Sequence, residues 1–430
     1  MKKERVGAFV IFILLFLPIV FWVSRIPLID RFDSFNPIIT SIGQILGLVG
    51  MAMFVITIIL SSRLKFLEDY FGGLNKIYFW HHFLGGFSLV FLLFHPMVLV
   101  LKFITTSLRS AALFFIPGTD LFITFGIIAL LTLILLLIFT LFINFPYKTW
   151  KITHKFMGVV FFFAILHTFF IPSDVSLYLP MKIYMGFLVS LGILAYLYRT
   201  IFGSILVKKF FYTVDQINQL NDKVVEIVMS AKSERINFLP GQFIFISFRG
   251  EGISRESHPF SISSGVQEDK LKVIVKNLGD YTAKLGNLKT GIEAKIEGPF
   301  GKFSYLHSSS RDQVWIAGGV GITPFISMAK SFVNNNYKVD LYYCTQTEDE
   351  MIFSKEFSEI SIKNSNFRLV PFCADIKGRI SVQAIVNFSG NLLQKDFFLC
   401  GPPLMMKNIR SQLIGMDVSR KNIHSEEFNF

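Results

Sequence analysis

The sequence is poor in charge and in cysteine for its length of 430 residues. Charged side chains make up 17% of the chain, whereas an average soluble domain has about 25%. The three cysteines are too few for a disulfide framework and all fall in the second half, as a reducing compartment permits: Cys344, Cys373 and Cys400. No internal repeat or low-complexity segment stands out. These shortages argue against an ordinary soluble enzyme, a disordered chain and a disulfide-stapled domain.

The shortage of charge is confined to the first half of the chain. Residues 1–205 hold 15 Lys and Arg and 7 Asp and Glu, whereas residues 206–430 hold 27 and 23. The net charge of +12 forms no basic stripe with interleaved aromatic residues, which argues against nucleic acid as a partner. Positive loops beside membrane spans explain the excess better. The composition therefore predicts a membrane half followed by a globular half.

Six apolar runs in the first half are long enough to span a membrane as helices, which takes about 20 residues each; they are 6–24, 37–60, 77–101, 121–143, 154–172 and 180–202. No small-residue cleavage site follows the first run, so we expect it to be a retained helix. Lys and Arg favour the loops on one side by 12 to 5, and such loops remain cytoplasmic. We expect a multi-pass protein of the cell membrane, embedded in lipid, with both termini and the second half cytoplasmic.

The second half has the patterns of two different sheets. Short alternating runs separated by turn residues predict a small antiparallel barrel; examples are 224–228, 243–246 and 271–275. From about residue 312 a strand (314–317), a helix (324–335) and a strand (339–344) follow one another, which is typical of a parallel α/β domain. The predicted fold is a six-helix transmembrane bundle (1–205), an antiparallel β-barrel (206–305) and an α/β parallel-sheet domain (306–430).

Four histidines of the first half form two matched pairs on spans that run in the same direction. His81 and His95 are 14 residues apart on the third span, and His154 and His167 are 13 apart on the fifth. Ionisable groups at bilayer depth are costly and indicate function by default. Since 14 helical residues rise about 21 Å, His81 and His154 should share an inner level, and His95 and His167 an outer one.

Helical geometry favours His81 over His82 as the inner residue of the third span. At about 100° per residue, a spacing of 14 brings two residues to one face, whereas the spacing of 13 on the fifth span requires local overwinding or a bulge. Gly85 and Gly158, four residues after His81 and His154, would leave room for a macrocycle. Hydrogen bonding across helices is the plain alternative, and zinc would need more ligands at one level. Two imidazoles at each level suit haem.

Polar segments of the second half suit a flavin and a nicotinamide nucleotide. The segment 258–261 could supply an apolar wall and backbone groups to a flavin ring, with Lys276 and Thr282 at the pyrophosphate. The segment 318–324 follows a strand and opens a helix, where glycines let dinucleotide phosphates approach the backbone. Cys400 ends another apolar strand. Taken singly, these features could equally be an edge strand, a turn or a buried core cysteine.

Together these features resemble the bacterial members of the NADPH oxidase and ferric reductase superfamily. The resemblance rests on the paired histidines, on the segments HPFSISS, KNLGDYT, GGVGITPF and CGPP, and on the ending HSEEF, in that order. It implies a ferric reductase-like transmembrane domain with two b-type haems, followed by a ferredoxin reductase-type FAD and NAD(P)H domain. It implies that His81 and His154 ligate the inner haem iron, and that His95 and His167 ligate the outer one.

The resemblance also implies the nucleotide contacts. For FAD they are His258, Pro259, Phe260, Ser261, Ile274, Lys276 (where the family often has Arg), Gly279, Tyr281, Thr282 and the stacking Phe428, whose place Phe430 could take. For NAD(P)H they are Gly318, Gly319, Val320, Gly321, Thr323, Pro324, Arg379, Cys400, Gly401, Pro402 and Pro403. Phe428 and Cys400 are the expected catalytic residues. NADPH-specific oxidases carry an Arg where this chain has Thr345-Gln346-Thr347, so NADH and NADPH both remain open.

The expected activity is that of an oxidoreductase that moves electrons from cytoplasmic NAD(P)H through FAD and two haems to an external acceptor. Hydride carries two electrons and haem carries one, so FAD has to stand between them. O2, giving superoxide, is the first choice of acceptor, and ferric chelate is the second. A distant alternative is a transporter or channel with a nucleotide-sensing domain, although the spans offer few pore-lining polar residues. No EF-hand pattern occurs, and no obligatory protein partner is evident.

Overall fold

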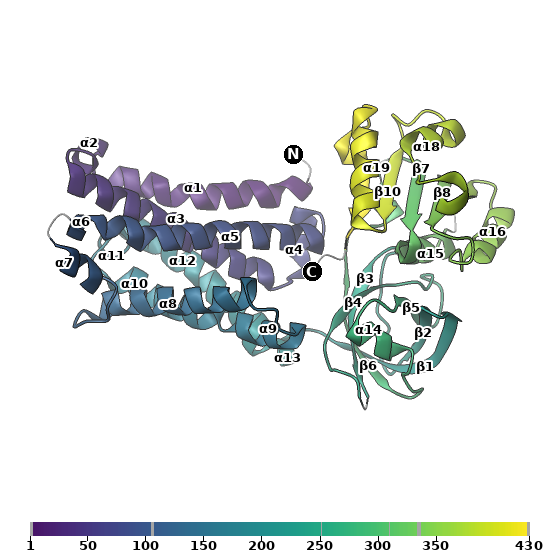
Figure 1. Ribbon diagram of the computed structural model, residues 1–430, viewed down its shortest axis with the longest axis horizontal. Helices are drawn as coiled ribbons and strands as arrows, with labels where there is room; N and C mark the ends of the chain where they lie inside the picture. The colour runs from purple at the N-terminus through teal and green to yellow at the C-terminus, as the bar shows by residue number, and fades with distance from the viewer. Residues whose placement is uncertain (1–2, 105–106, 251, 309, 333–336, 428–430) are drawn as a thin grey trace. The chain divides into compact units, whose positions relative to one another are not determined.

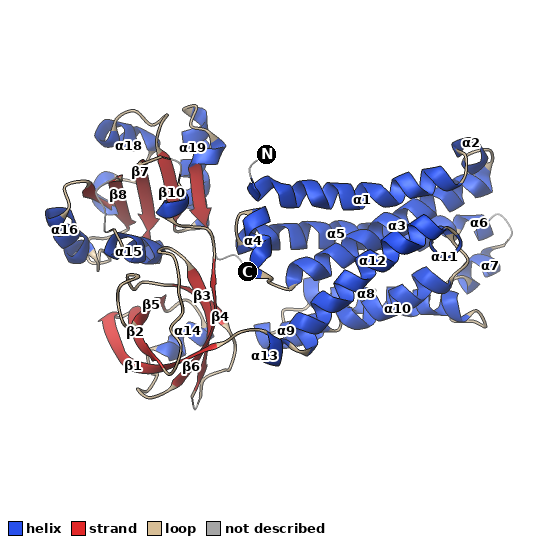
Figure 2. Ribbon diagram, turned by 180° about the vertical axis from the view of Figure 1, so that it is seen from behind, coloured by secondary structure: helices blue, strands red, loops and turns tan. Residues whose placement is uncertain are grey.

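The computed structural model describes residues 3–104, 107–250, 252–308, 310–332 and 337–427. The chain separates into two compact units, Met1–Val207 and Lys208–Phe430 (Figure 1). The first unit is helical, and both sheets belong to the second (Figure 2).

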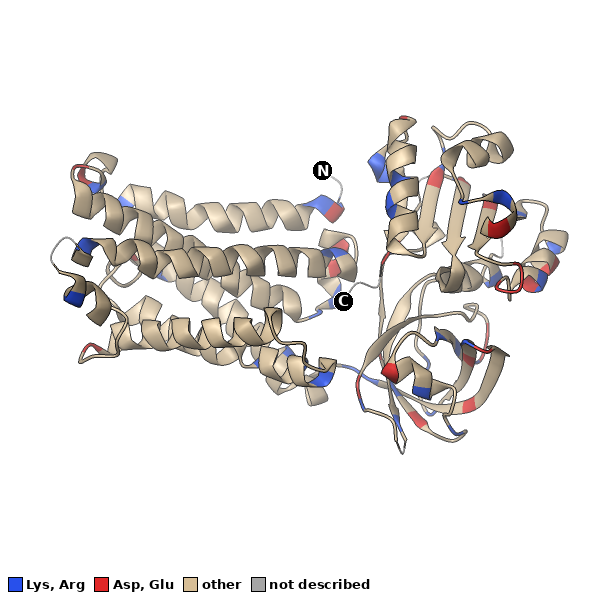
Figure 3. Ribbon diagram, in the orientation of Figure 1, with Lys and Arg blue, Asp and Glu red and all other residues tan. Residues whose placement is uncertain are grey.

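Long apolar helices make up the first unit. Its elements are η1 (Lys3–Arg5), α1 (Val6–Arg25), α2 (Leu28–Arg31), α3 (Phe35–Ser61), α4 (Lys65–Phe71), α5 (Leu74–Leu99), α6 (Leu101–Ile104), α7 (Leu108–Leu113), α8 (Leu121–Leu141), α9 (Tyr147–Lys155), α10 (Met157–Phe170), α11 (Asp174–Leu177), α12 (Leu179–Tyr196), η2 (Leu197–Ile201) and α13 (Gly203–Leu206). Six stretches of the described chain are long and apolar enough to cross a membrane, which confirms the six expected spans. Charged residues gather at the helix ends (Figure 3).

Helix α3 is the most buried of these spans. Ala52 and Val55 on α3 are fully buried, and a side chain at Gly192 of α12 would come within 2.7 Å of Val55 Cγ1. Small residues at helix crossings allow such close backbone approach, which matters in lipid because dispersion contacts have to hold helices together there. Phe54 of α3 packs edge-on against Phe161 of α10, with ring centres 5.9 Å apart.

The fifth span is interrupted at Phe156, between α9 and α10. Phe156 N donates to Thr153 O (3.0 Å), and Val159 N donates to Phe156 O (2.8 Å). These i to i+3 bonds wind the chain more tightly than an α-helix does. The local overwinding that the 13-residue histidine spacing requires is therefore present, and it supplies part of the missing rotation.

The first part of the second unit is a six-stranded antiparallel sheet in the order β4-β3-β6-β1-β2-β5. Its strands are β1 (Phe210–Asn221), β2 (Val224–Ala231), β3 (Phe243–Arg249), β4 (His258–Ser261), β5 (Leu271–Lys276) and β6 (Glu293–Phe300), with α14 (Asp280–Leu285) after β5. The strands are antiparallel, as predicted, but the sheet does not close into the predicted barrel. Because β4 has only four residues, its end meets the far edge strand at a single bridge, Ile262 to Val273, rather than along a ladder.

The second part is a five-stranded parallel sheet in the order β11-β10-β7-β8-β9. Its elements are β7 (Asp312–Gly318), η4 (Gly319–Ile322), α15 (Thr323–Lys330), β8 (Lys338–Thr345), α16 (Ser354–Lys363), β9 (Phe367–Cys373), α17 (Ala374–Lys377), α18 (Val382–Ser389), β10 (Asp396–Cys400), α19 (Pro403–Gly415) and β11 (Ile423–Glu426), with short turns η3 (Tyr305–His307) and η5 (Arg420–Asn422). The predicted helix over 324–335 is shorter than expected, because α15 ends at Lys330.

Helices cover both faces of the parallel sheet, because successive strand residues point to opposite sides. Trp315 of β7 and Phe398 of β10 belong to one core cluster with α15 and Phe357 of α16. Their neighbours Ile316 and Leu399 belong to the other cluster, with α18 and α19. The sheet is thus buried on both sides, and its polar chemistry is left to the strand ends.

A buried carboxylate ties β10 to β11 and to the segment before β7. Asp396 is 1% exposed, and its Oδ2 accepts a hydrogen bond from Ser308 Oγ and lies 3.5 Å from His424 Nε2. Burial alone would raise the pKa of Asp396, but the His424 imidazole and the Ser308 hydroxyl outweigh burial and lower that pKa below its usual value of 3.8. The resulting stabilisation is present above about pH 4 and is lost as the pH falls further.

We expect Asp396→Asn to lower the thermal unfolding midpoint at pH 7, because a buried hydrogen-bonded charge is removed at a cost of about 1–3 kcal/mol. The wild-type midpoint should fall between pH 5 and pH 3 more than that of the variant. Asp269→Asn, at an exposed ion pair with Arg235, is the matched control and should change stability by less than about 0.5 kcal/mol. Equal acid sensitivity of wild type and Asp396→Asn would contradict this account.

Candidate functional site

His95 of α5 and His167 of α10 face each other, with ring centres 6.3 Å apart and planes at 70°. His95 Nδ1 lies 2.7 Å from Gly43 O, and His167 Nδ1 lies 2.8 Å from Phe122 O. Because a carbonyl oxygen can only accept, each Nδ1 carries the ring proton, and each Nε2 keeps its lone pair. The two rings are thus held in the tautomer that can bind a metal through Nε2.

His81 of α5 and His154 of α9 repeat this arrangement, again with ring centres 6.3 Å apart. His81 Nδ1 lies 2.9 Å from Thr57 O, while the ring of His154 stacks on Trp150 at 5.3 Å. His154 Nδ1 is buried without a hydrogen-bond partner among the described residues. His82 is exposed on the outer surface of α5. The structure therefore brings together the same two pairs that the sequence spacing predicts.

The distance of 6.3 Å between ring centres shows whether two imidazoles are spaced for a shared metal ion or for a direct hydrogen bond. With a metal–nitrogen bond of about 2.0–2.1 Å and a ring centre about 1.1 Å behind the nitrogen, one metal between two imidazoles places their centres about 6.3 Å apart. A direct hydrogen bond of about 2.9 Å would place them only about 5 Å apart. No group of three or more His, Cys, Asp or Glu that could hold a metal ion occurs among the described residues. Both pairs therefore have the donor set and spacing for one metal ion between two histidines.

Two glycines that sequence reasoning missed support the outer pair. A side chain at Gly47 would lie 2.8 Å from His95 Nδ1, and one at Gly126 would lie 2.7 Å from His167 Nδ1. One glycine singled out from the sequence has another neighbour, which corrects its proposed role. A side chain at Gly158 would collide with the Tyr196 ring, whereas one at Gly85 would make only an ordinary contact with Thr57, 3.5 Å away. Gly158 thus makes room for Tyr196 rather than for a macrocycle.

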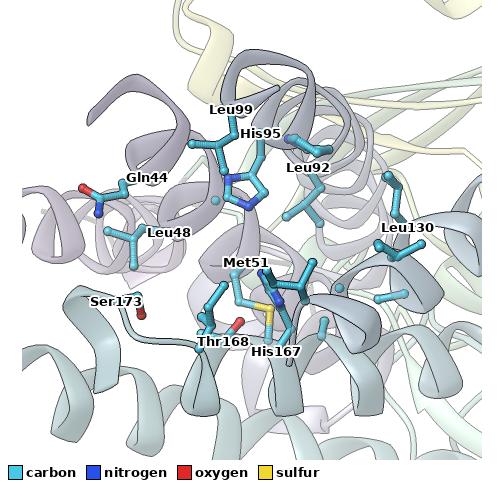
Figure 4. Close-up of a pocket in the computed structure, with 18 of the residues that line it drawn as sticks. Gln44, Leu48, Met51, Leu92, His95, Leu99, Leu130, His167, Thr168 and Ser173 are labelled. Carbon is cyan, nitrogen blue, oxygen red and sulfur yellow. The ribbon is translucent and has the colours of Figure 1, made fainter. Parts of the chain in front are cut away.

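A cavity of about 350 Å³ lies around the outer pair (Figure 4). Its wall is mostly apolar, with Met51, Leu92 and Leu130 beside the two histidines. Its volume falls within the range of about 300–1,000 Å³ that is usual for ligand sites. The His95 and His167 rings both reach this cavity, so a planar group held between them would be surrounded by hydrocarbon.

A polar cluster forms part of the cavity wall, and sequence reasoning missed it. Gln44, Ser173 and Asp174 line the cavity. Asp174 is 2% exposed, and its Oδ1 lies 2.5 Å from Arg25 Nη1 and 3.3 Å from Arg31 Nη2. Gln44 Oε1 accepts hydrogen bonds from Trp22 Nε1 and Arg31 Nη1. The NH2 group of the Gln44 amide therefore points away from these two residues. The signal available in the sequence was a glutamine inside an otherwise apolar span.

The predicted nicotinamide contacts meet at the carboxyl ends of β7 and β10, which are parallel neighbours. A side chain at Gly321 would collide with Cys400 O, and one at Gly318 would lie 2.6 Å from Pro402. Gly319 has a φ of +53°, and Thr323 Oγ1 donates to Val320 O (2.8 Å). The two turns are thus packed backbone against backbone, with Pro324 in the first turn of α15 and Pro403 in the first turn of α19.

Cys400 lies at this meeting point, but its thiol is 4% exposed. Burial raises its pKa well above the usual value, and nearby Glu426 and Glu427 add to the shift. Cys400 is therefore held as a neutral thiol. The other residue predicted to be catalytic, Phe428, lies outside the described residues, as does Phe430.

The predicted flavin contacts lie on β4, β5 and α14. His258 stacks on Tyr281 with ring centres 3.8 Å apart, and its Nε2 lies 3.3 Å from Glu256 Oε2. Burial raises the pKa of Tyr281 to about 12, so its phenol stays protonated. Pro259 is half-buried beside His258, whereas Phe260, Ser261 and Ile274 are buried within their strands. The stacked rings of His258 and Tyr281 form a half-buried aromatic shelf, a flat surface beside the buried residues of β4 and β5.

The predicted phosphate contacts are less completely assembled. Lys276 closes β5 and is half-buried. Thr282 Oγ1 accepts from Leu278 N (2.9 Å) and Gly279 N (3.0 Å) and donates to Gly279 O (3.1 Å). The hydroxyl therefore shapes the start of α14, and a phosphate contact would require it to turn away from Gly279 O. Arg379 is exposed on the loop between α17 and α18.

Three known families match this chain in sequence. The ferric reductase like transmembrane component matches residues 46–165, an FAD-binding domain matches 210–304, and the oxidoreductase NAD-binding domain matches 315–411. These matches confirm the predicted ferric reductase-like membrane domain, flavin domain and nucleotide domain. Together with the spans, they indicate a multi-pass membrane oxidoreductase.

Individual relatives are similar to part of this chain. The glycine betaine monooxygenase reductase subunit of Chromohalobacter salexigens is 28% identical over 208 residues, 44% of this chain and 56% of that protein. The 2-halobenzoate 1,2-dioxygenase electron transfer component of Burkholderia cepacia is 28% identical over 208 residues, 46% of this chain and 60% of that protein. The chain spans a little over half the length of these curated relatives. A flavohemoglobin structure from Malassezia yamatoensis aligns with 78% of this chain and 94% of its own, at 17% identity and a TM-score of 0.49.

If the outer histidine pair holds haem b, as the sequence predicts, we expect Gly126→Ala to lower the amount of haem b bound per chain. The added methyl group would lie 2.7 Å from His167 Nδ1 and would have to displace the ring, a strain of about 1–3 kcal/mol. Gly86→Ala on α5 is the control, because its methyl group would meet nothing within 4 Å. Reduced-minus-oxidised spectra of the purified chains provide the measurement. Full haem content in both variants would show that Gly126 does not shape the site.

We expect Gly321→Ala to weaken nucleotide binding by about tenfold, because its methyl group would collide with Cys400 O and force apart the two packed turns. Gly415→Ala on α19 has open space and should bind the nucleotide like wild type. Calorimetric titration of both variants with NADH and NADPH tests the difference. Unchanged affinity in Gly321→Ala would remove the packed turns from the binding site.

Proposed function

From the domain arrangement of the NADPH oxidase and ferric reductase superfamily, which this chain has, we propose that it carries electrons from NAD(P)H through FAD and two b-type haems across the membrane. The observation that carries the proposal is the presence of two opposed histidine pairs, each with ring centres 6.3 Å apart, on the same two membrane spans, Leu74–Ile104 and Tyr147–Phe170. We propose that the nucleotide domains are cytoplasmic, because Lys and Arg concentrate in the loops on that side.

In this proposal His81 with His154, and His95 with His167, would hold the iron of the two haems. The carbonyls of Thr57, Gly43 and Phe122 hold three of the rings with Nε2 free, and hydrogen bonds of this kind also raise ligand basicity. The apolar wall around the outer pair excludes water.

When bound, FAD takes two electrons as hydride from the nicotinamide and can release them singly, and each haem can carry one electron. The residues of this chain position these groups. The Gly318–Gly321 turn and the start of α15 offer backbone N–H groups to the dinucleotide phosphates. The shelf of His258 and Tyr281 offers a ring-sized surface to the flavin. Cys400 lines the nicotinamide pocket, and because its buried thiol is neutral, it adds no charge there.

For the acceptor we propose O2, with superoxide as the product of a one-electron transfer. Ferric chelate is the second candidate, because the matching membrane family is that of ferric reductases. The test follows purified chain with NADH or NADPH and compares O2 uptake and superoxide formation with the reduction of ferric citrate. Superoxide formed in proportion to nucleotide oxidation supports the first acceptor. Ferric reduction that persists without O2 and exceeds O2 uptake supports the second.

We expect His167→Leu to remove one of two haems per chain and to abolish transfer to the external acceptor, while NAD(P)H still reduces FAD. The outer pair would lose one ligand, whereas the second unit is not altered. His82→Leu is the matched control, since His82 is exposed on the same helix as His81 and should keep both haems. Haem content by reduced-minus-oxidised spectroscopy and flavin bleaching without O2 give the two readouts. Two haems remaining in His167→Leu would overturn the ligand assignment.

A further inference from the structure

The order of strands fixes which part of a dinucleotide meets which loop. The turn Gly318–Gly321 follows β7, and Cys400-Gly401 follows β10 on one side of it, while β8 lies on the other side. In open α/β sheets a dinucleotide lies across the carboxyl ends of the strands, with its pyrophosphate at the glycine turn. With the nicotinamide at the β10 end, the adenosine ribose lies at the end of β8, where Gln346 follows Thr345.

Two carboxylates are hydrogen-bonded to Gln346. Gln346 N donates to Glu350 Oε2 (3.1 Å), and Gln346 Nε2 donates to Asp375 Oδ1. Asp375 N donates in return to Gln346 O (3.1 Å), and Thr345 Oγ1 donates to Thr347 O (2.7 Å). The loop after β8 and helix α17, which follows β9, are therefore fixed to each other, with both acidic side chains at the carboxyl edge.

The charge around this position is negative. The loop after β8 reads Thr347-Glu348-Asp349-Glu350, all acidic after the threonine, and Asp375 of α17 adds a fourth carboxylate. The cations of this region are Lys377 of α17, whose Nζ donates to Pro371 O (2.9 Å), and the exposed Arg379. A phosphate monoester carries about −1.5 to −2 charges at neutral pH. It would therefore meet repulsion here, whereas a ribose 2′-hydroxyl is a donor that a carboxylate can accept.

We infer that this chain selects NADH over NADPH, and that Asp375 and Glu350 are the residues that set the preference. The inference rests on the proposed function only in taking a nicotinamide nucleotide as the electron donor. Repulsion between two carboxylates and the 2′-phosphate of NADPH, at a solvent-exposed site, is worth about tenfold or more in affinity. The contribution of Arg379 is then smaller than that of the carboxylates opposite it.

The test measures dissociation constants of NADH and NADPH by calorimetry for the full, flavin- and haem-loaded chain, with both cofactors reduced beforehand without O2 so that the heat reports binding alone. We expect NADH to bind about tenfold more tightly than NADPH at low salt. Asp375→Asn and Glu350→Gln should each tighten NADPH binding about threefold and together bring the ratio close to one. Glu359→Gln, an equal change of charge in the middle of α16, is the control and should leave the ratio unchanged. The preference should also shrink with added salt, because the Debye length falls from about 10 Å at 0.1 M to about 3 Å at 1 M.

Two outcomes would overturn the inference: wild type that binds NADPH as tightly as NADH, or a ratio that neither carboxylate variant shifts. Flavin bleaching without O2, followed in separate samples of the oxidised chain, tests the proposed function independently. If neither nucleotide bleaches the flavin, the proposed electron donor is wrong, while the measured affinities still decide the preference. If NADPH bleaches the flavin faster and binds more tightly, the electron-transfer function stands and this inference fails.

Discussion

The arrangement of the membrane unit depends on hydrogen bonds from imidazole Nδ1 atoms to backbone carbonyls of neighbouring helices. Such a carbonyl oxygen already accepts a backbone hydrogen bond within its own helix. Its second lone pair can accept a bond from a histidine only if no side chain blocks the approach. The side chain four residues further along a helix leans back over that carbonyl. Gly47 follows Gly43 by four residues, and Gly126 follows Phe122 by four. In both places the missing side chain leaves the carbonyl open to a histidine.

The same rule explains why the inner pair differs from the outer one. The residue four positions after Thr57 is Ser61, which is small, and its hydroxyl is bonded to Ile58 O. His81 can therefore reach Thr57 O. His154 lies on the short helix α9 just before the break at Phe156, and its ring is held by stacking on Trp150 instead. Three rings are thus fixed by a directional bond and one by a ring face, which leaves His154 the freest to turn.

The spacing of the histidines predicts their pairing, because it depends only on helical rise and rotation within one span. It even predicts the overwound turn at Phe156. Sequence reasoning gave the wrong role to Gly158, because the space beside a glycine depends on which helix packs there. That information lies in long-range contacts, such as Tyr196 against Gly158, which periodicity within one helix does not contain.

In the second unit, the local sequence patterns predict the individual strands. They do not predict whether the antiparallel sheet closes into a barrel or which distant segments meet. Alternation along β2, β3 and β5 predicts each strand, since side-chain direction has a period of two. Whether β4 and β5 close a barrel depends on the length of β4, which is set by pairing to β3 rather than by its own residues. The meeting of Gly321 with Cys400 joins segments 79 positions apart, and only the parallel pairing of β7 with β10 brings them together.

The shortage of charge in the first unit follows from the cost of placing ions in hydrocarbon, and the exceptions obey the same rule. The buried charges beside the outer cavity form one cluster, in which Asp174 is shared between Arg25 and Arg31. Arg31 also lies over the Trp22 ring at 3.9 Å and donates to Trp22 O. A guanidinium can be buried there because its donors meet a carboxylate, an amide and a carbonyl at once. Two arginines against one carboxylate leave this cluster one positive charge in excess, at the wall of the cavity that contains the outer histidines.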